Sequence, residues 1–246
     1  MITQKHTRTY RKTAIAVGIL YIVATVVSLL STALTSADLE APDYLARAGA
    51  HGDRWIAGAL LLIAGGLACS LIAALLFPVL RRYGEGAALG YAGIRVLEAV
   101  TLFVSAVSLL LLVSAGRDFV AAGHSAASSG IAASGAVLLA LNEWAFPLNP
   151  VVFGAGGLLL YGLLYRSRLV PRWLSVWGLG GVMLVFAYGV LRMYGGGSMA
   201  LAIPIGVQEM VLAGWLIVKG FDFSASRQEG LPARAPAAFE LAGGGS

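Results

Sequence analysis

Charged side chains are scarce in this sequence. Asp, Glu, Lys and Arg make up 12% of its 246 residues, whereas hydrophobic residues make up 59%, and the mean hydropathy is +0.83. Since about a quarter of the residues in an average soluble domain are charged, this composition excludes an ordinary soluble domain. It is typical of a protein with several membrane-spanning helices, and the 32 glycines fit close packing between such helices.

Cysteine and histidine are also nearly absent. The single cysteine, Cys69, excludes an internal disulfide and a thiolate metal cluster. The three histidines, His6, His51 and His124, fall outside the predicted spans, so haem or zinc inside the membrane would lack its usual ligands. The sequence contains no HExxH or GxSxG motif and carries no recognised catalytic signature. We therefore expect no cofactor and no metal.

Six apolar segments are long enough to cross a membrane core of about 30 Å, which takes about 20 helical residues. They are roughly Thr13–Thr35, Ile56–Leu80, Ala87–Ser114, a long segment ending at Tyr165, Trp173–Tyr194 and Met199–Val218. The predicted fold is all-α, an integral membrane bundle of six transmembrane helices. It consists of an N-terminal segment 1–12, a transmembrane domain 13–220 and a disordered tail 221–246, whose final GGGS is typical of a linker.

Basic residues between the spans predict the topology. The N-terminus, the turns after the second and fourth spans, and the tail hold 12 of the 17 Lys and Arg residues, all on one predicted side. By the positive-inside rule, both termini are then cytoplasmic. This arrangement accounts for the isoelectric point of about 9.6 without any nucleic-acid partner.

Two segments allow a second interpretation. The first span resembles a secretory signal, but its apolar run of about 23 residues exceeds the 7–15 of a signal, which favours an uncleaved helix. The fourth segment exceeds one crossing and contains Pro147 and Pro150. Two crossings would place the basic turn after it outside. We therefore expect one crossing with a proline-broken outer extension over residues 116–146, either lying on the outer membrane surface or re-entrant.

A stripe of polar residues runs through the third span. It consists of Tyr91, Arg95, Glu98, Thr101, Ser105 and Ser108, at steps of three and four residues that place them on one helix face. A milder stripe in the first span includes Tyr21, and the sixth span carries Gln208 and Glu209 in apolar surroundings.

Three of these residues are ionisable and lie deep in the membrane. Arg95, Glu98 and Glu209 are about 12, 16 and 15 Å from the predicted cytoplasmic surface. Each charge at a helix centre costs about 2.5–3.5 kcal/mol on the insertion scale. We therefore expect Arg95 to pair with Glu98, Glu209 or both inside the bundle. One acid is then in excess, and both its ionised and its protonated form fit the pattern.

The candidate site follows from this pairing. The predicted ligand-binding residues are Tyr91, Arg95, Glu98, Tyr188, Gln208 and Glu209, and the candidate catalytic acids are Glu98 and Glu209. Glu143 and Arg192 form a second predicted polar cluster at the outer face. The alternative is that the ion pairs only fix helix register.

Several stretches resemble a known family. "IRVLEAVTLFV", "VVFGAGGLLLYGLLYRSRLVPRWLSVWGLGG" and "PIGVQEMVLAGWLIVKGF" are similar to an uncharacterised bacterial membrane-protein family, domain of unknown function 4386, over about residues 8–221. The most specific elements are Arg95 with Glu98, then Ser167 with Pro171, then Gln208 with Glu209. The resemblance implies a six-helix integral membrane protein and carries no activity with it.

Three functions remain open from the sequence. The first is binding or transport of a small, lipid-like or anionic ligand, with Arg95 attracting an anionic group and a glutamate exchanging a proton. The second is an intramembrane enzyme that acts on a lipid or isoprenoid, with a buried glutamate as general acid. The third is a structural membrane subunit. In each case we expect a multi-pass protein of the bacterial inner membrane, in contact with membrane lipids and able to form homo-oligomers.

Overall fold

The computed structural model describes residues 2–123 and 126–223, and the side chains of residues 10–123 and 128–223 within them. The helices are α1 Ile2–Leu39, α2 Tyr44–Ala50, α3 Gly52–Leu80, α4 Glu85–Ala122, α5 Ala126–Ser167, α6 Arg172–Met193, the 3-10 turn η1 Met199–Ala202, and α7 Ile203–Val218. These ranges contain no strand. Most of the predicted tail, from residue 224 onward, lies outside the described residues.

The predicted all-helical class and the six spans are confirmed. Six helices are long and apolar enough to cross a membrane, namely α1 from Tyr10, α3, α4, α5, α6 and α7 with η1. Together they indicate a multi-pass membrane protein. The sequence did not single out α2, which has seven residues and is too short to span.

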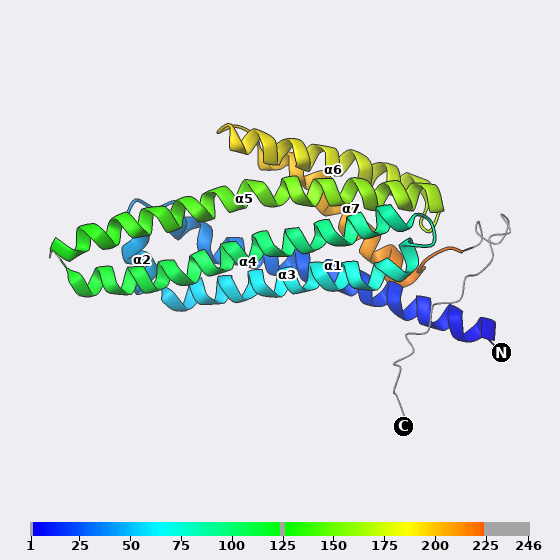
Figure 1. The fold of residues 1–246 in the computed structure, drawn as a ribbon, viewed down its shortest axis with the longest axis horizontal. Helices are drawn as coiled ribbons and strands as arrows, with labels where there is room; N and C mark the ends of the chain where they lie inside the picture. The colour runs from blue at the N-terminus through cyan, green and yellow to red at the C-terminus, as the bar shows by residue number, and fades with distance from the viewer. Residues whose placement is uncertain (1, 124–125, 224–246) are drawn as a thin grey trace, which may run out of the picture.

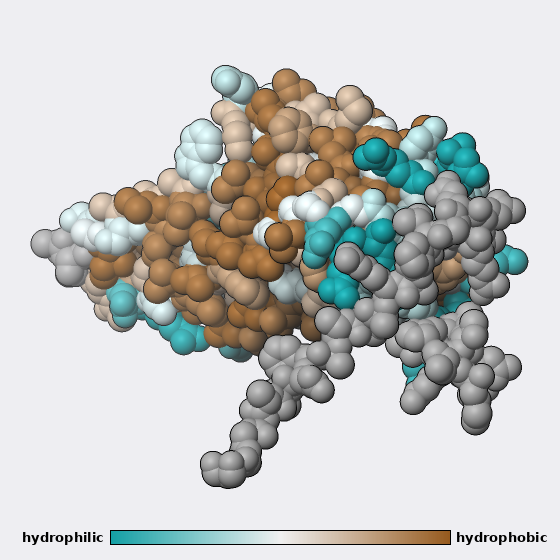
Figure 2. Space-filling view, turned by 45° about the vertical axis from the view of Figure 1, so that its right-hand side comes forward, coloured by the Kyte–Doolittle hydropathy of each residue, from teal (hydrophilic) through white to brown (hydrophobic). Residues whose placement is uncertain are grey.

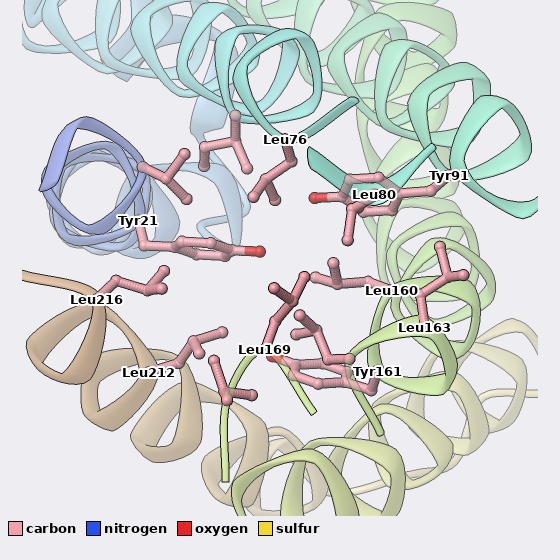
Figure 3. Packing of buried hydrophobic residues seen from close by; sticks show 14 of the residues in the cluster. Tyr21, Leu76, Leu80, Tyr91, Leu160, Tyr161, Leu163, Leu169, Leu212 and Leu216 are labelled. Atoms are coloured by element: carbon pink, nitrogen blue, oxygen red, sulfur yellow. The ribbon is translucent and has the colours of Figure 1, made fainter. Parts of the chain in front are cut away.

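The six long helices form a closed ring. Along the chain, α1 packs on α3, α3 on α4, α4 on α5, α5 on α6 and α6 on α7, and α7 returns to pack on α1. Figure 3 shows buried side chains from several of these helices converging on the middle of the ring, Tyr21 and Tyr91 among them. The functional question therefore concerns the inside of this ring.

The two ends of the ring differ. The N-terminus, the turn between α3 and α4, the turn between α5 and α6, and the end of α7 lie together, and we call this the terminal end (Figure 1). The opposite end carries α2 and the tip of the hairpin that α4 and α5 form, and we call it the hairpin end. Local sequence explains the turn between α5 and α6, since Arg168 takes a left-handed backbone angle (φ 55°) and Pro171 directly precedes α6.

The fourth predicted span is one unbroken helix. Pro147 and Pro150 both lie inside α5, so the prediction that they break it is wrong. Residues 116–122 belong to α4 and residues 126–146 to α5, and in Figure 1 both segments run on along the direction of the ring. At 1.5 Å per residue the two helices are about 57 and 63 Å long, so the hairpin extends well beyond a 30 Å membrane core.

Backbone contact between α2 and α4 steadies the hairpin end. A Cβ atom on Gly116 would lie 2.5 Å from both the amide nitrogen of Gly49 and the carbonyl oxygen of Leu45, so only glycine allows this approach. Arg47 on α2 also binds Asp38 at the end of α1 (Nη1–Oδ1 3.3 Å) and Asp43 (Nε–Oδ1 2.7 Å). These two carboxylates, Asp43 first, raise the pKa of the Arg47 guanidinium.

The outer surface of the ring is apolar. Large exposed hydrophobic side chains occur along every long helix, for example Leu29 on α1, Leu67 on α3, Val107 on α4 and Met183 on α6. Figure 2 shows this surface as a broad hydrophobic area over the middle of the molecule, with hydrophilic residues toward its ends. Such a surface is suited to contact with lipid chains, so the charged residues at mid-height must face inward.

Candidate functional site

Arg95 and Glu98 form an ion pair inside the ring. They are one helical turn apart on α4, and Arg95 Nη1 lies 2.6 Å from Glu98 Oε2. Only 5% of Arg95 and 4% of Glu98 is exposed. Of the pairings expected for Arg95, the one with Glu98 is therefore formed, within one helix and away from the lipid-facing surface.

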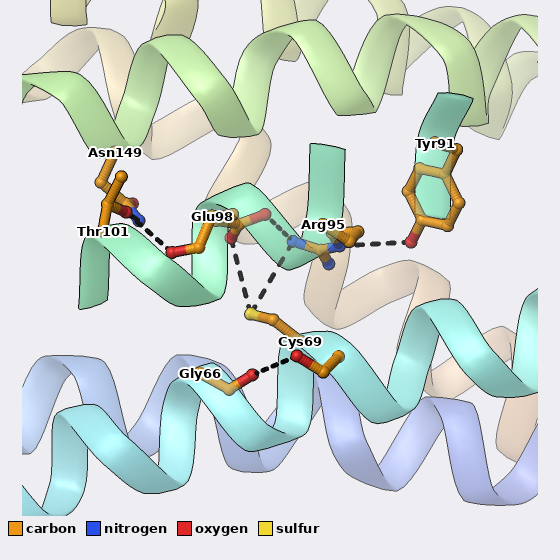
Figure 4. Close-up of polar contacts among 8 residues, drawn as sticks. Gly66, Cys69, Tyr91, Arg95, Glu98, Thr101 and Asn149 are labelled. Atoms are coloured by element: carbon orange, nitrogen blue, oxygen red, sulfur yellow. Dashed lines mark hydrogen bonds and ion pairs between the residues drawn. The ribbon is translucent and has the colours of Figure 1, made fainter. Parts of the chain in front are cut away.

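The Arg95 guanidinium has further contacts besides this ion pair. Its Nε donates to the hydroxyl of Tyr91 (3.2 Å), and its Nη1 also approaches the sulfur of Cys69 on α3 at 3.9 Å (Figure 4). Three aromatic rings surround the cation, with centroids 5.5 Å away at Phe153, 5.7 Å at Tyr21 and 5.9 Å at Tyr91. The rings attract the cation through their faces, so Arg95 is held by partners on nearly every side.

The part of the predicted polar stripe nearer the hairpin end, which includes Thr101 and Ser108, has a different role. Thr101 accepts a hydrogen bond from Asn149 Nδ2 (2.8 Å), and Ser108 accepts one from Asn142 Nδ2 (2.8 Å). The two pairs are seven residues apart on both α4 and α5, so they repeat every two turns of an antiparallel helix pair. These residues fasten α4 to α5 and do not line a cavity. The stripe therefore divides into a charged site and a helix–helix contact.

Gln208 and Glu209, adjacent on α7, lie in different environments. Gln208 is fully buried, donates to the carbonyl of Leu174 on α6 (3.1 Å) and accepts from the hydroxyl of Tyr161 on α5 (2.6 Å). It therefore ties three helices together. Glu209 instead lines a small cavity beside Arg95. Among the described residues its carboxylate forms no ion pair or hydrogen bond.

The cavity between Arg95 and Glu209 has room for the centre of one water molecule. Its volume is about 10 Å³, close to the smallest space that holds a water molecule. It is lined by Tyr21, Tyr91, Arg95, Phe153, Gly157, Leu160, Tyr161 and Glu209. The Tyr21 hydroxyl is buried and has no hydrogen-bond partner among the described residues. In Figure 3 this hydroxyl points into the middle of the ring.

A second cavity of the same size lies next to the first. It is lined by Tyr21, Leu76, Leu160, Leu164, Val170, Leu212, Leu216 and Phe221. Tyr21 and Leu160 belong to both linings, so they separate the two spaces. Val170 and Phe221 belong to the terminal end of the ring. The two cavities thus lie in a row from the charged centre toward that end.

The other predicted site residues, which are Tyr188, Glu143 and Arg192, lie away from this centre. Tyr188 is buried on α6 and lines neither cavity. Glu143 and Arg192 are both exposed, and the described part of the chain contains no ion pair between them. Neither carries a contact that ties it to the Arg95 site.

Sequence reasoning missed four contributors to the centre, which are Cys69, Phe153, Leu160 and Tyr161. Cys69 lies in an apolar run and donates its thiol to Glu98 Oε1 at 3.5 Å. Tyr161, in "GLLLYGLLY", is one of the two polar side chains of its apolar run, with Tyr165, and was the available signal. Phe153 and Leu160 are indistinguishable in sequence from lipid-facing residues. In the described residues no group of His, Cys, Asp and Glu is arranged to hold a metal ion.

Comparison with known proteins gives one match, to a family model. A family model described as a domain of unknown function, DUF4386, matches residues 16–220, which include all six spans in whole or in large part. No curated protein and no solved structure matches the chain. Because the family model covers most of the sequence, including Arg95, Glu98 and Glu209, the chain belongs to the family of the domain of unknown function DUF4386.

Proposed function

We propose that this protein binds a small ligand inside the ring, at the site formed by Arg95, Glu98 and Glu209, and carries it across the membrane. We further propose that it lies in the bacterial inner membrane with both termini in the cytoplasm, as the distribution of basic residues favours. The terminal end of the ring is then cytoplasmic and the hairpin end is external.

The observation that supports a binding site is the unpaired state of Glu209. A cluster that only fixed helix packing would leave no carboxylate without a partner at mid-height, because such groups are costly there. Gln208 and the pairs between α4 and α5 already tie the helices together. Glu209 and the Tyr21 hydroxyl, by contrast, face a cavity without a protein partner.

The size of the cavity indicates the conformational state to which the structure corresponds. About 10 Å³ admits one water and excludes any organic ligand. Transport through this site therefore requires the helices around it to separate, first on one side and then on the other, as in transporters that alternate access. The structure corresponds to a closed state in this scheme.

The enzyme hypothesis has less support. Aromatic faces that would stabilise a cationic intermediate are already occupied by the Arg95 guanidinium. The small cavity also leaves no space for a lipid or isoprenoid chain beside Glu209. Both features are expected of a binding site in its closed state.

The test is an uptake screen with purified full-length protein in lipid vesicles. Vesicles are incubated with a mixture of small metabolites, and their contents are measured by mass spectrometry. We expect at least one compound to accumulate with the wild type and not with Glu209→Gln or with the double variant Arg95→Met, Glu98→Leu. Glu143→Gln, which changes an exposed glutamate outside the site, should retain uptake. Equal uptake by wild type, Glu209→Gln and protein-free vesicles for every compound would refute the proposal.

A further inference from the structure

The charges inside the ring do not balance. Three ionisable Lys, Arg, Asp or Glu side chains meet at the cavity and its ion pair, of which Arg95 and Glu98 are buried and Glu209 is partly buried. Arg95 and Glu98 compensate each other at 2.6 Å. Glu209 therefore carries one negative charge in excess if it is ionised. The site as a whole favours a positive charge over a negative one.

The site is poorly suited to an anion. An anionic group would have to compete with Glu98 for Arg95 and would approach through the faces of Tyr21, Tyr91 and Phe153. Those faces are electron-rich and repel an anion. The sequence had pointed to Arg95 as the attractive group, whereas the structure leaves Glu209 as the group with unused capacity.

The cavity also excludes most cations. A Na⁺ or K⁺ ion needs several oxygen ligands, and the lining offers only the Glu209 carboxylate and a few phenol oxygens. Of these, the Tyr91 oxygen already accepts from Arg95. A proton needs one oxygen and no cage. A space for one water beside Glu209 is sufficient to deliver it.

The titratable side chains on the helices around Glu209 include no unpaired cation that could compensate its charge. They are Tyr21 on α1, Cys69 on α3, Tyr91, Arg95 and Glu98 on α4, and Tyr161 on α5. On α6, Tyr188 lines neither cavity. Arg95 is the only cation in this set and is already paired, so no neighbour supplies the positive charge that Glu209 lacks.

We propose that Glu209 is a proton-binding site, reached from the terminal end of the ring past Tyr21, whose hydroxyl is the one polar side-chain group among the residues that line the second cavity. A hydronium ion or water-borne proton forms an O–H bond with a carboxylate oxygen of Glu209 and leaves a neutral water molecule behind. The unpartnered Tyr21 hydroxyl, which lies between the cavities, relays the proton by accepting one hydrogen bond and donating another. This inference rests on the proposed function, in which proton binding at Glu209 drives or opposes movement of the ligand.

Infrared spectroscopy of the full-length protein in lipid bilayers tests proton binding directly. We expect the wild type at neutral pH to show the carbonyl band of a protonated carboxylic acid, shielded from rapid exchange with bulk water. Glu209→Gln should lose this band, and Glu143→Gln should keep it. Tyr21→Phe should keep the band and slow its hydrogen–deuterium exchange. Size-exclusion chromatography and circular dichroism show whether each variant is folded. An unchanged band in folded Glu209→Gln would overturn the inference.

The route is tested separately by proton entry into vesicles that contain a pH-sensitive dye. We expect Leu160→Ala, which opens the passage between the cavities, to speed the response to an imposed pH gradient. Adding Glu209→Gln to it should return the rate to that of protein-free vesicles. Rates that do not depend on Glu209 would overturn the route. If ligand is taken up but no Glu209 proton band appears, the proposed function stands and this inference is refuted. If the band appears but no ligand is taken up, proton binding at Glu209 stands and transport is refuted.

Discussion

At the scale of single residues, the main feature is a buried ion pair whose two charges compensate each other. Glu98 compensates the charge of Arg95 at 2.6 Å, and the pair is almost fully excluded from the surface. Removing one member of such a pair is much more harmful than replacing both, because the remaining charge is left buried without compensation.

We therefore predict that Glu98→Leu destabilises the protein by about 3–5 kcal/mol. The double variant Arg95→Met, Glu98→Leu should be considerably more stable than Glu98→Leu alone, since no charge then remains without its partner. Unfolding in lipid-like detergent, followed by circular dichroism, measures both. If the double variant were as unstable as the single one, the pair would not be held by charge compensation.

At the scale of helices, close backbone contact decides how the hairpin end is built. α2 lies against α4 because Gly49 and Gly116 have no side chains to separate the two backbones. Polar pairs between Asn142 and Ser108 and between Asn149 and Thr101 then hold α5 to α4 along their length. The hairpin can extend beyond the membrane core because both of its helices are supported.

We predict that Gly116→Ala loosens α2 while leaving the six spans in place. The added Cβ atom would lie 2.5 Å from backbone atoms of Gly49 and Leu45, which cannot rotate away. Hydrogen exchange should therefore increase in residues 44–50. Gly130→Ala on α5, where no atom lies within 4 Å of the new Cβ, is the matched control. Unchanged exchange in α2 would show that it tolerates the displacement.

At the scale of the whole molecule, the two ends of the ring are expected to face different compartments. The proposed route for protons begins at the terminal end, which the basic residues predict to be cytoplasmic. If the orientation were reversed, the same route would begin outside the cell. Orientation therefore decides the direction in which Glu209 exchanges protons.

Single cysteines introduced into a Cys69→Ser background test this orientation in intact cells. We predict that a membrane-impermeant maleimide labels Gly196→Cys, in the loop between α6 and α7, without disrupting the cells. Gly86→Cys, near the terminal end of α4 and exposed with no atom within 4 Å of its Cβ, should react only after the cells are opened. The opposite pattern would place both termini outside.

The sequence by itself determined the number of spans and the existence of a charged interior. Both follow from quantities that can be summed along the chain, which are the length of each apolar run and the cost of a charge at mid-membrane. The same argument predicted that Arg95 pairs with Glu98, Glu209 or both, and Glu98 was available because residues three apart share a helix face. It failed at Pro147 and Pro150, where packing on α4 and α6 maintains a helix that local preference would break.

Only the tertiary structure decided which partner each polar side chain meets. Gln208 and Glu209 are neighbours in sequence, but adjacent positions on a helix point about 100° apart, so one joins α5 to α6 and the other faces the cavity. The rotation of each helix in the ring fixes this choice, and no local pattern encodes that rotation. For the same reason only the structure reveals that Arg95 is paired with Glu98 and that Glu209 is the carboxylate left without a protein partner.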